Sequence, residues 1–286
     1  MSTTTDLART AVGPPTTLGA RIQLAVADGM VVAWRNLVAI WRVPVVLVFE
    51  LVQPVMFVVL FRFIYENALA DLPVDYVLFL MPGIFIQNAI FGSTTTAIGI
   101  AEDLKKGLID RFRSLPMARS AVLVGRTVSD LAKNLVLVAL VIVIGYLVGF
   151  RFQQGVVSAL GVVVLVLAVS FTFSWISATV GLAIKEVEAV QAAVFTFVFP
   201  IVFVSAAFVP VQGMASFLQV VARNNPITHW CNLARYLAVG EIAITDPTTG
   251  MPIDTFEGLV VKSAAWIAGL LVVFVPLSVR LYRRLT

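Results

Sequence analysis

Repeated apolar runs, each about as long as a membrane is thick, constrain this chain more than any other feature of its sequence. A helix needs about 20 consecutive apolar residues to cross about 30 Å of hydrocarbon. Of the 286 residues, 60% are apolar and 13% are charged. Because backbone polar groups in lipid must be paired within the chain, such runs become helices. The sequence therefore predicts an all-α polytopic membrane protein.

We expect six transmembrane helices, with bounds read from the apolar runs and the charged breaks between them. They cover residues 45–65, 76–101, 134–150, 156–184, 191–211 and 258–279. The fourth run is long enough to tilt. Pro200 is expected to break the fifth helix. The chain then divides into a mobile cytosolic tail, residues 1–20, and one transmembrane domain, residues 21–286.

The distribution of charge predicts which side of the membrane each end faces. With a cytosolic N-terminus, most of the 20 lysines and arginines fall on the inner side and the outer segments are richer in acids. The positive-inside rule then places both termini in the cytosol of a bacterial plasma membrane. The net charge of +4 thus reports topology and not nucleic-acid binding. The polar N-terminal stretch lacks the apolar core of a cleaved signal peptide.

An amphipathic helix is expected before the first span, over residues 21–41. Its polar face repeats every seven residues, at Arg21, Asp28, Arg35 and Arg42. Such a helix lies in the inner membrane interface. A seventh span is the alternative, and its charges make that interpretation unfavourable.

A second amphipathic helix is expected between two spans, over residues 102–115, and it is the most distinctive segment of the chain. Its apolar stripe consists of Leu104, Leu108, Phe112 and Leu115. Its other faces carry Glu102, Asp103, Lys105, Asp110, Arg111 and Arg113. Mixed charge fits a soluble protein partner better than a lipid surface, which favours basic faces. The third helix is expected to begin in the cytosol near residue 118 and to hold this docking helix away from the bilayer; a helix lying on the lipid surface is the alternative.

The outer segment between the fifth and sixth spans contains two apolar stretches that are too short to cross. These are residues 214–222 and 228–239, and Asn225 and Pro226 form the turn between them. Thr228 is the expected N-cap of the second stretch. We expect a re-entrant hairpin that dips into the outer leaflet, with a surface helical loop as the alternative.

Polar and aromatic side chains inside the spans are candidates for a substrate path. They are Glu50, Gln53, Gln87, Asn88, Thr94, Phe199 and Phe203. A carboxylate in a span is costly and suggests function, although Glu50 could instead pair with a basic residue near the interface. Polar side chains also hold helices together, and phenylalanines also face lipid or core, so both interpretations stay open.

No enzymatic site emerges from the sequence. The one histidine, His229, and the one cysteine, Cys231, lie two residues apart and cannot form a typical metal site, so we expect neither catalytic nor metal-binding residues. A P-loop sequence is absent. If transport uses ATP, another polypeptide binds it together with magnesium, and this chain binds no cofactor of its own.

The run from Asp103 to Thr127, the Gly149–Phe152 stretch and residues 208–228 together resemble the membrane subunits of ABC-2 type exporters. Among them the chain is most similar to the daunorubicin/doxorubicin-resistance permeases, from about residue 25 onward. The family often has Leu at the position of Ile227. The resemblance implies that residues 102–115 couple to an ATPase and that re-entrant helices cover residues 214–239. It also implies a unit of two P-loop ATPases and two permeases, identical or paralogous, with the path between the permeases.

We therefore expect the permease subunit of an ATP-driven exporter of a hydrophobic drug or lipid-like substrate. Two other classes stay open. An ATP-independent secondary transporter or channel would work without an ATPase, and a membrane scaffold would not transport at all.

Overall fold

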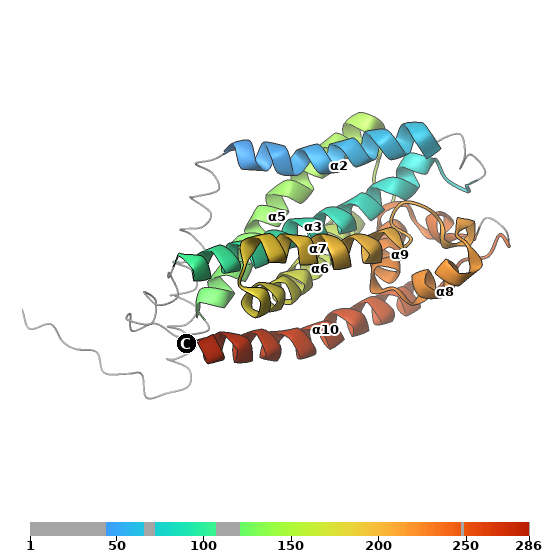
Figure 1. Ribbon diagram of the computed structural model, residues 1–286. Helices are drawn as coiled ribbons and strands as arrows, with labels where there is room; N and C mark the ends of the chain where they lie inside the picture. Colours follow the sequence, from blue (N-terminus) through green and yellow to red (C-terminus); the bar gives the residue numbers. More distant parts are fainter. Residues whose placement is uncertain (1–43, 66–71, 107–120, 247–248, 286) are drawn as a thin grey trace, which may run out of the picture.

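The computed structural model describes residues 44–65, 72–106, 121–246 and 249–285. Long helices run side by side along one axis, and a cluster of short helices closes one end (Figure 1). The helices are α2 (Pro44–Tyr65), α3 (Tyr76–Lys105), α5 (Ala121–Val148), α6 (Gly155–Ile184), α7 (Val187–Phe203), α8 (Ser216–Asn224), α9 (Pro226–Val239) and α10 (Phe256–Leu285), with 3-10 turns at Val211–Gly213 and Glu241–Ile244. One antiparallel bridge joins Thr245 and Pro252. The described residues are therefore almost entirely helical, as the composition predicts.

The two ends of the bundle differ. At one end α2 begins, α3 ends, α5 begins and α10 ends (Figure 1); we call this the basal end. The opposite end carries α8 and α9, and we call it the distal end. Since α3 ends at the basal end and α5 begins there, the chain connects the two helices through residues 107–120, which lie outside the described residues.

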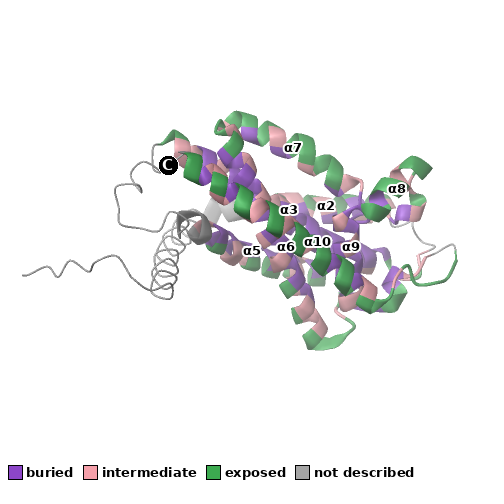
Figure 2. Cartoon of the chain, turned by 90° about the horizontal axis from the view of Figure 1, so that it is seen from below, coloured by how far each residue is buried: buried purple, intermediate pink, exposed green. Residues whose placement is uncertain are grey.

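The helix α3 forms the centre of the fold. Of its span, 83% is buried within the chain, against 17% for α2 and 11% for α10. Figure 2 shows the same division, with buried residues gathered in the middle and exposed ones along α7, α8 and α10. The apolar outer faces suit lipid, whereas α3 is surrounded by protein.

Glycines allow two elements to approach α3 closely. A Cβ on Gly181 of α6 would lie 2.5 Å from the Ala97 carbonyl oxygen of α3. A Cβ on Gly83 of α3 would collide with the carbonyl of Ala207, in the segment after α7. Small residues at such positions let backbones touch, which is how helices associate in lipid.

Five helices are long and apolar enough to cross a membrane, namely α2, α3, α5, α6 and α10. These match five of the six expected spans. The remaining one is shorter than predicted, because α7 ends at Phe203 and not near residue 211. Its 17 residues would extend about 26 Å at 1.5 Å each.

The expected break at Pro200 is wrong, because Pro200 lies inside α7 and the helix ends after Phe203. Asn225 explains the stop: its side-chain amide donates to the carbonyls of Ile201 and Val204, each at 2.7 Å. These carbonyls at the helix end are thereby satisfied without a further turn. A distant asparagine, and not the local proline, ends this helix.

The expected docking helix, residues 102–115, is called the docking segment below, and the helices next to it extend beyond their apolar runs. The helix α3 continues to Lys105, so Glu102, Asp103, Leu104 and Lys105 form its last turn and not the start of a separate helix. The helix α5 begins at Ala121, 13 residues before its apolar run. Residues 1–43, with the expected tail and interfacial helix, lie outside the described residues. So do Leu108, Asp110, Arg111, Phe112, Arg113 and Leu115.

The close approach of α6 to α3 predicts that Gly181→Ala destabilises the protein. The added methyl would push against the α3 backbone, and overpacking of this kind costs about 1–3 kcal/mol. Gly269→Ala in α10 is the matched control, because a Cβ there meets nothing within 4 Å. Thermal unfolding in detergent should show a lower midpoint for Gly181→Ala and an unchanged or raised midpoint for Gly269→Ala. Equal midpoints would contradict the packing argument.

Candidate functional site

Charged and hydroxyl side chains join α5 to α3 in a series of contacts that begins at the basal end. Arg126, Asp130 and Lys133 fall on one face of α5, because they are spaced by four and three residues. Arg126 Nη1 donates to Asp103 Oδ2 of α3 at 2.6 Å. The Thr96 hydroxyl donates to Asp130 Oδ2. We call these two contacts and the next one, made by Lys133, the polar ladder.

The last rung of the polar ladder reaches a third helix. Lys133 Nζ donates to the Thr95 hydroxyl at 2.8 Å and to the Gly92 carbonyl at 3.3 Å, both on α3. It also pairs with Glu50 Oε1 of α2 at 3.0 Å. The side chains of Lys133 and Glu50 are only 5% and 20% exposed, so each charge depends on the other. Glu50 is therefore paired with a basic residue of α5.

A neutral network continues from the polar ladder toward α6. Asn134 Nδ2 donates to Ser170 Oγ at 2.6 Å, and Ser170 Oγ lies 3.0 Å from Ser93 Oγ. The polar side chains along α3, which we call the polar seam, are Gln87, Asn88, Ser93, Thr94, Thr95 and Thr96. Three of them, Ser93, Thr95 and Thr96, thus hold helices together. For these three residues the structure favours the helix-association interpretation.

The other side of the seam faces an open groove of about 420 Å³ between α2, α3 and α7. The residues that line it are Phe49, Glu50, Gln53, Asn88, Phe91, Gly92, Thr94, Thr95, Ile98, Leu137, Gln191, Val194 and Phe195. Four of the candidate path residues therefore line one groove, namely Glu50 and Gln53 from α2 and Asn88 and Thr94 from α3. Its polar lining consists of amides, hydroxyls and one carboxylate.

Three candidate path residues do not line this groove. Gln87 is buried beside Asn88, and its Oε1 has no partner among the described residues. Phe199 and Phe203 of α7 stack with ring centroids 4.2 Å apart. Phe203 also lies 5.0 Å from the ring of Phe208, and Phe199 contacts Phe91 at 6.2 Å. These two phenylalanines form an aromatic row that continues the groove wall toward the distal end.

At the distal end, non-helical backbone after α7 is held by side chains from other elements. The Tyr76 hydroxyl donates to the Phe208 carbonyl at 2.8 Å. The Ala206 amide donates to the Thr228 hydroxyl at 3.0 Å. Backbone groups at membrane depth are tolerated only when protein satisfies them in this way.

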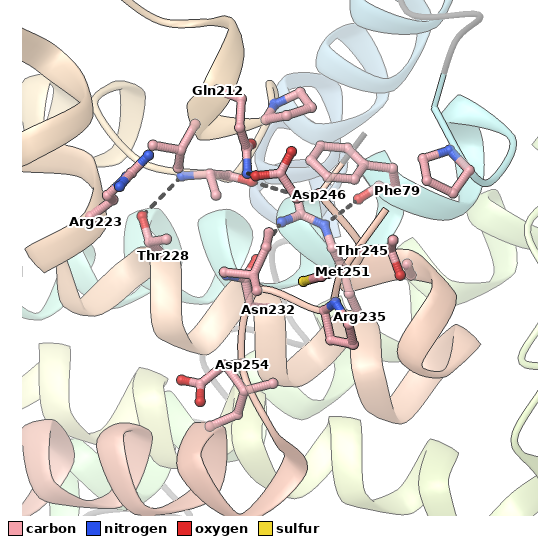
Figure 3. Close-up of a pocket in the computed structure, with 18 of the residues that line it drawn as sticks. Phe79, Gln212, Arg223, Thr228, Asn232, Arg235, Thr245, Asp246, Met251 and Asp254 are labelled. Carbon is pink, nitrogen blue, oxygen red and sulfur yellow. Dashed lines mark hydrogen bonds between the residues drawn. The ribbon is translucent and has the colours of Figure 1, made fainter. Parts of the chain in front are cut away.

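Arg235 of α9 is the centre of this distal arrangement (Figure 3). Its side chain is fully buried and donates to the carbonyls of Phe79 at 2.8 Å and Ala207 at 3.1 Å, and to that of Ala206. It also donates to Asn232 Oδ1 at 3.1 Å and stacks on the Phe79 ring. Burial lowers the pKa of Arg235 to about 10, which leaves it charged at neutral pH. Arg235 thus fastens α9 and the segment after α7 to α3.

The short helices α8 and α9 occupy the two predicted short stretches, with the turn at Asn225 and Pro226. The predicted N-cap is wrong. Asn225 caps α9, since its Oδ1 accepts from the Ile227 amide at 2.9 Å, and Thr228 lies inside the helix. The preference of proline for the first helical position explains the start at Pro226.

A second cavity, of about 410 Å³, lies beneath the distal loops. Around it Gln212 Nε2 donates to Asp246 Oδ2 at 3.0 Å, and Lys262 pairs with Asp254 at 2.6 Å. His229 also lines it, and burial lowers the pKa of this histidine. Among the described residues no group of three His, Cys, Asp or Glu side chains could hold a metal ion. Residues of α9 and of the segment after α7 line part of the cavity, and residues between α9 and α10, among them Thr245, Asp246 and Met251, line much of the rest (Figure 3).

The sequence analysis did not identify Lys133 and Arg235, which join several elements in the polar ladder and at the distal end. Charge counting placed Arg126 and Lys133 in a cytosolic segment and Arg235 in an outer loop, although the structure buries Lys133 and Arg235. One signal was available for the first group. The spacing of Arg126, Asp130 and Lys133 marks a single face of α5, and the second span offers a polar seam of matching chemistry.

Comparisons with known proteins identify what the chain resembles. A family model described as ABC-2 type transporter matches residues 29–239. A daunorubicin resistance ABC transporter permease protein of Streptomyces coeruleorubidus is 30% identical over 91% of this chain and 87% of its own length. A probable doxorubicin resistance ABC transporter permease protein of Mycobacterium tuberculosis H37Rv is 27% identical over 82% of this chain and 80% of its own. A putative transport permease of Cyanophora paradoxa is 25% identical over 71% of each.

Arg235→Met is expected to destabilise the distal end severely. The substitution leaves buried carbonyls of α3 and the segment after α7 without donors, at about 1–3 kcal/mol each. Arg223→Met is the matched control, because Arg223 of α8 is exposed and makes one long contact of 3.4 Å with Gln219. Thermal unfolding and limited proteolysis between α7 and α9 should separate the two variants. Wild-type stability of Arg235→Met would show that the carbonyls find other partners.

The Lys133–Glu50 pair predicts strong coupling in a double-mutant cycle. Lys133→Met alone strands a largely buried carboxylate, which costs about 3–5 kcal/mol. Adding Glu50→Leu removes the stranded charge and should recover most of that loss. Unfolding midpoints of the wild type, both single variants and the double variant give the interaction free energy. Additive effects would mean that the two side chains act independently.

Proposed function

This chain belongs to the ABC-2 type transporter family and is a transmembrane subunit of an ABC exporter, and we propose that it moves a hydrophobic drug or lipid-like substrate out of a bacterial cell. ATP and magnesium would be held by two copies of a separate P-loop ATPase. The family match over residues 29–239 and the five long apolar helices support this assignment. The names of the relatives, which refer to resistance against daunorubicin and doxorubicin, support the substrate class.

We place the basal end in the cytosol and the distal end at the outer surface. Basic residues gather at the basal end, on the last turns of α3 and α10. The positive-inside rule supports this orientation. Both termini and the docking segment, residues 102–115, would then face the ATPases.

The polar ladder is the observation that carries the proposed mechanism. The docking segment joins α3 to α5. At the start of this segment, the ion pair of Asp103 and Arg126 links the two helices with an N–O distance of 2.6 Å. Farther along the same face, Lys133 of α5 holds Glu50 in the groove at 3.0 Å. A force applied to the docking segment would move α3 and α5 together and would reach Glu50 through contacts that are largely buried. Leu108 and Phe112 are the proposed contacts with the ATPase.

The groove between α2, α3 and α7 is the proposed inner part of the substrate path. Its outer edges carry exposed aromatic side chains, Phe49 at 71% and Phe195 at 61%. In the assembled exporter we propose that a second permease, identical or paralogous, faces this side of the chain, so that the path lies between the two. Lipid would cover the remaining apolar faces.

The distal hairpin of α8 and α9 is proposed to dip into the outer leaflet. Phe217, Val220 and Val221 give α8 an exposed apolar face, which suits the acyl region. Arg235 and Asn225 satisfy the backbone that this placement would take out of water. The hairpin would close the outer end of the path in the resting state.

A pull-down tests the exporter assignment. Tagged full-length chain, recovered from membranes of its host, should bring a soluble P-loop ATPase and MgATP hydrolysis with it. Leu108→Asp combined with Phe112→Asp should lose the ATPase, because two charges would replace the apolar stripe of the docking segment. The variant should remain folded in the membrane.

The matched control carries two equivalent changes at the opposite end, Ile242→Asp and Met251→Asp, where both side chains are exposed. It should retain the ATPase and export. Elution of the wild-type chain without any ATPase would favour an ATP-independent carrier or a scaffold. Normal ATPase binding and export by the Leu108/Phe112 variant would remove the docking segment from the mechanism.

A further inference from the structure

We propose that the groove contains a recognition subsite for an uncharged amphipathic ligand, formed by Glu50 Oε2 as hydrogen-bond acceptor and Asn88 Nδ2 as donor. The ligand would present a hydroxyl group to Glu50 and a carbonyl or ether oxygen to Asn88. This inference rests on the proposed function, because it assumes that the groove belongs to the substrate path. It adds the polar chemistry by which the substrate is selected.

Unsatisfied hydrogen-bonding atoms mark the subsite. Glu50 Oε2 and Asn88 Nδ2 are both buried and have no hydrogen-bond partner among the described residues. Leaving such an atom unpaired costs about 1–3 kcal/mol, and buried polar groups in native proteins are rarely left so. Both residues line the groove. Because the terminal torsions of Glu and Asn are soft, a small rotation presents each atom to a molecule in the groove.

Glu50 is held in place through its other carboxylate oxygen. Lys133 Nζ fixes Glu50 Oε1 at 3.0 Å and is itself anchored on Thr95 at 2.8 Å. The carboxylate therefore has one committed oxygen and one available oxygen. A group held on one side in this way loses little conformational freedom when a ligand binds the other side.

The charge of the subsite favours a neutral ligand. Among the described residues that line the groove, Glu50 is the one charged side chain, and Lys133 compensates it from behind. A hydroxyl group can donate to Glu50 Oε2 without changing this balance. An ammonium group at Glu50 Oε2 would share one carboxylate with Lys133 and leave a net positive charge in a region of low dielectric constant, which is costly. The remaining polar lining, Gln53, Thr94 and Gln191, is uncharged as well.

The rest of the groove fits an apolar body. Phe91, Ile98 and Val194 line its walls together with the exposed rings of Phe49 and Phe195. Its volume of about 420 Å³ lies in the range of small-molecule sites, roughly 300–1,000 Å³. Polar recognition is thus concentrated at Glu50 and Asn88, and the walls supply non-specific apolar contact.

Matched probes test this assignment on the full-length chain in lipid nanodiscs. The probes are 6-hydroxymethyl-2-acetylnaphthalene, its methoxymethyl and aminomethyl analogues, and 2-hydroxymethylnaphthalene, which lacks the carbonyl acceptor. Equilibrium dialysis against empty nanodiscs corrects for partition into lipid. The hydroxymethyl ketone should bind at least about tenfold more tightly than the methoxymethyl and aminomethyl analogues, the effect of one hydrogen bond to a charged acceptor.

Two variants test whether Glu50 binds the hydroxyl group of the probe and Asn88 its carbonyl oxygen. Glu50→Leu combined with Lys133→Met removes the pair without stranding a charge and should abolish the preference for hydroxymethyl over methoxymethyl. Asn88→Leu should weaken the hydroxymethyl ketone about tenfold and leave 2-hydroxymethylnaphthalene unchanged. Asn224→Leu, at an exposed asparagine of α8, is the matched control and should bind all probes as the wild type does.

Three results would overturn the proposal. They are equal binding of the hydroxymethyl and methoxymethyl ketones by the wild type, tighter binding of the aminomethyl analogue, or no binding of any probe above empty nanodiscs. None of these results affects the exporter assignment, which depends on recovery of the ATPase. Recovery of the ATPase together with any of them would retain the exporter and reject this subsite.

Discussion

The burial of α3 within a single chain is the constraint on which the rest of the structure depends. A span surrounded by lipid needs only apolar side chains, whereas a span surrounded by protein can carry polar ones if each finds a partner. Four regions described above are attached to α3: α6 through Gly181, α5 through the polar ladder, the segment after α7 through Gly83, and α9 through the contact of Arg235 with the Phe79 carbonyl. One polar face of α3 therefore associates with α5 and α6, and the other faces the groove.

The long spans could be predicted because length and apolar composition are local properties. The end of α7 could not, because it is determined by Asn225, more than twenty residues later in the chain. The polar seam shows the same limit. The polarity of its residues predicts that they avoid lipid. Whether Ser93 bonds to Ser170, and whether Asn88 faces a groove, depends on how α5, α6 and α7 pack. The sequence pattern indicates that these side chains need hydrogen-bond partners, and only the tertiary structure shows which residues are the partners.

Charged residues were the least predictable part of the candidate site. The rule that basic residues lie in the cytosol treats each as a solvated charge, and it suits the exposed arginines near the end of α10. It fails for Lys133 and Arg235, which are buried and bonded to protein. Lys133 compensates a carboxylate, whereas Arg235 has carbonyl oxygens as its acceptors. The pair of Lys133 and Glu50 leaves one carboxylate oxygen available at the groove. Arg235 fastens three segments of backbone without a counter-ion among the described residues.

The partners of α3 in the polar ladder and its neutral extension all lie later in the sequence. Thr95, Thr96 and Ser93 bond to Lys133, Asp130 and Ser170 respectively, and α3 is the least hydrophobic of the five long helices. During synthesis α3 therefore reaches the membrane before the helices that carry its partners have been inserted. Its hydroxyls must first bond to its own backbone or to water, and the packed bundle forms only after α6 has been inserted. For this chain, insertion of α3 and assembly of the fold are necessarily separate events.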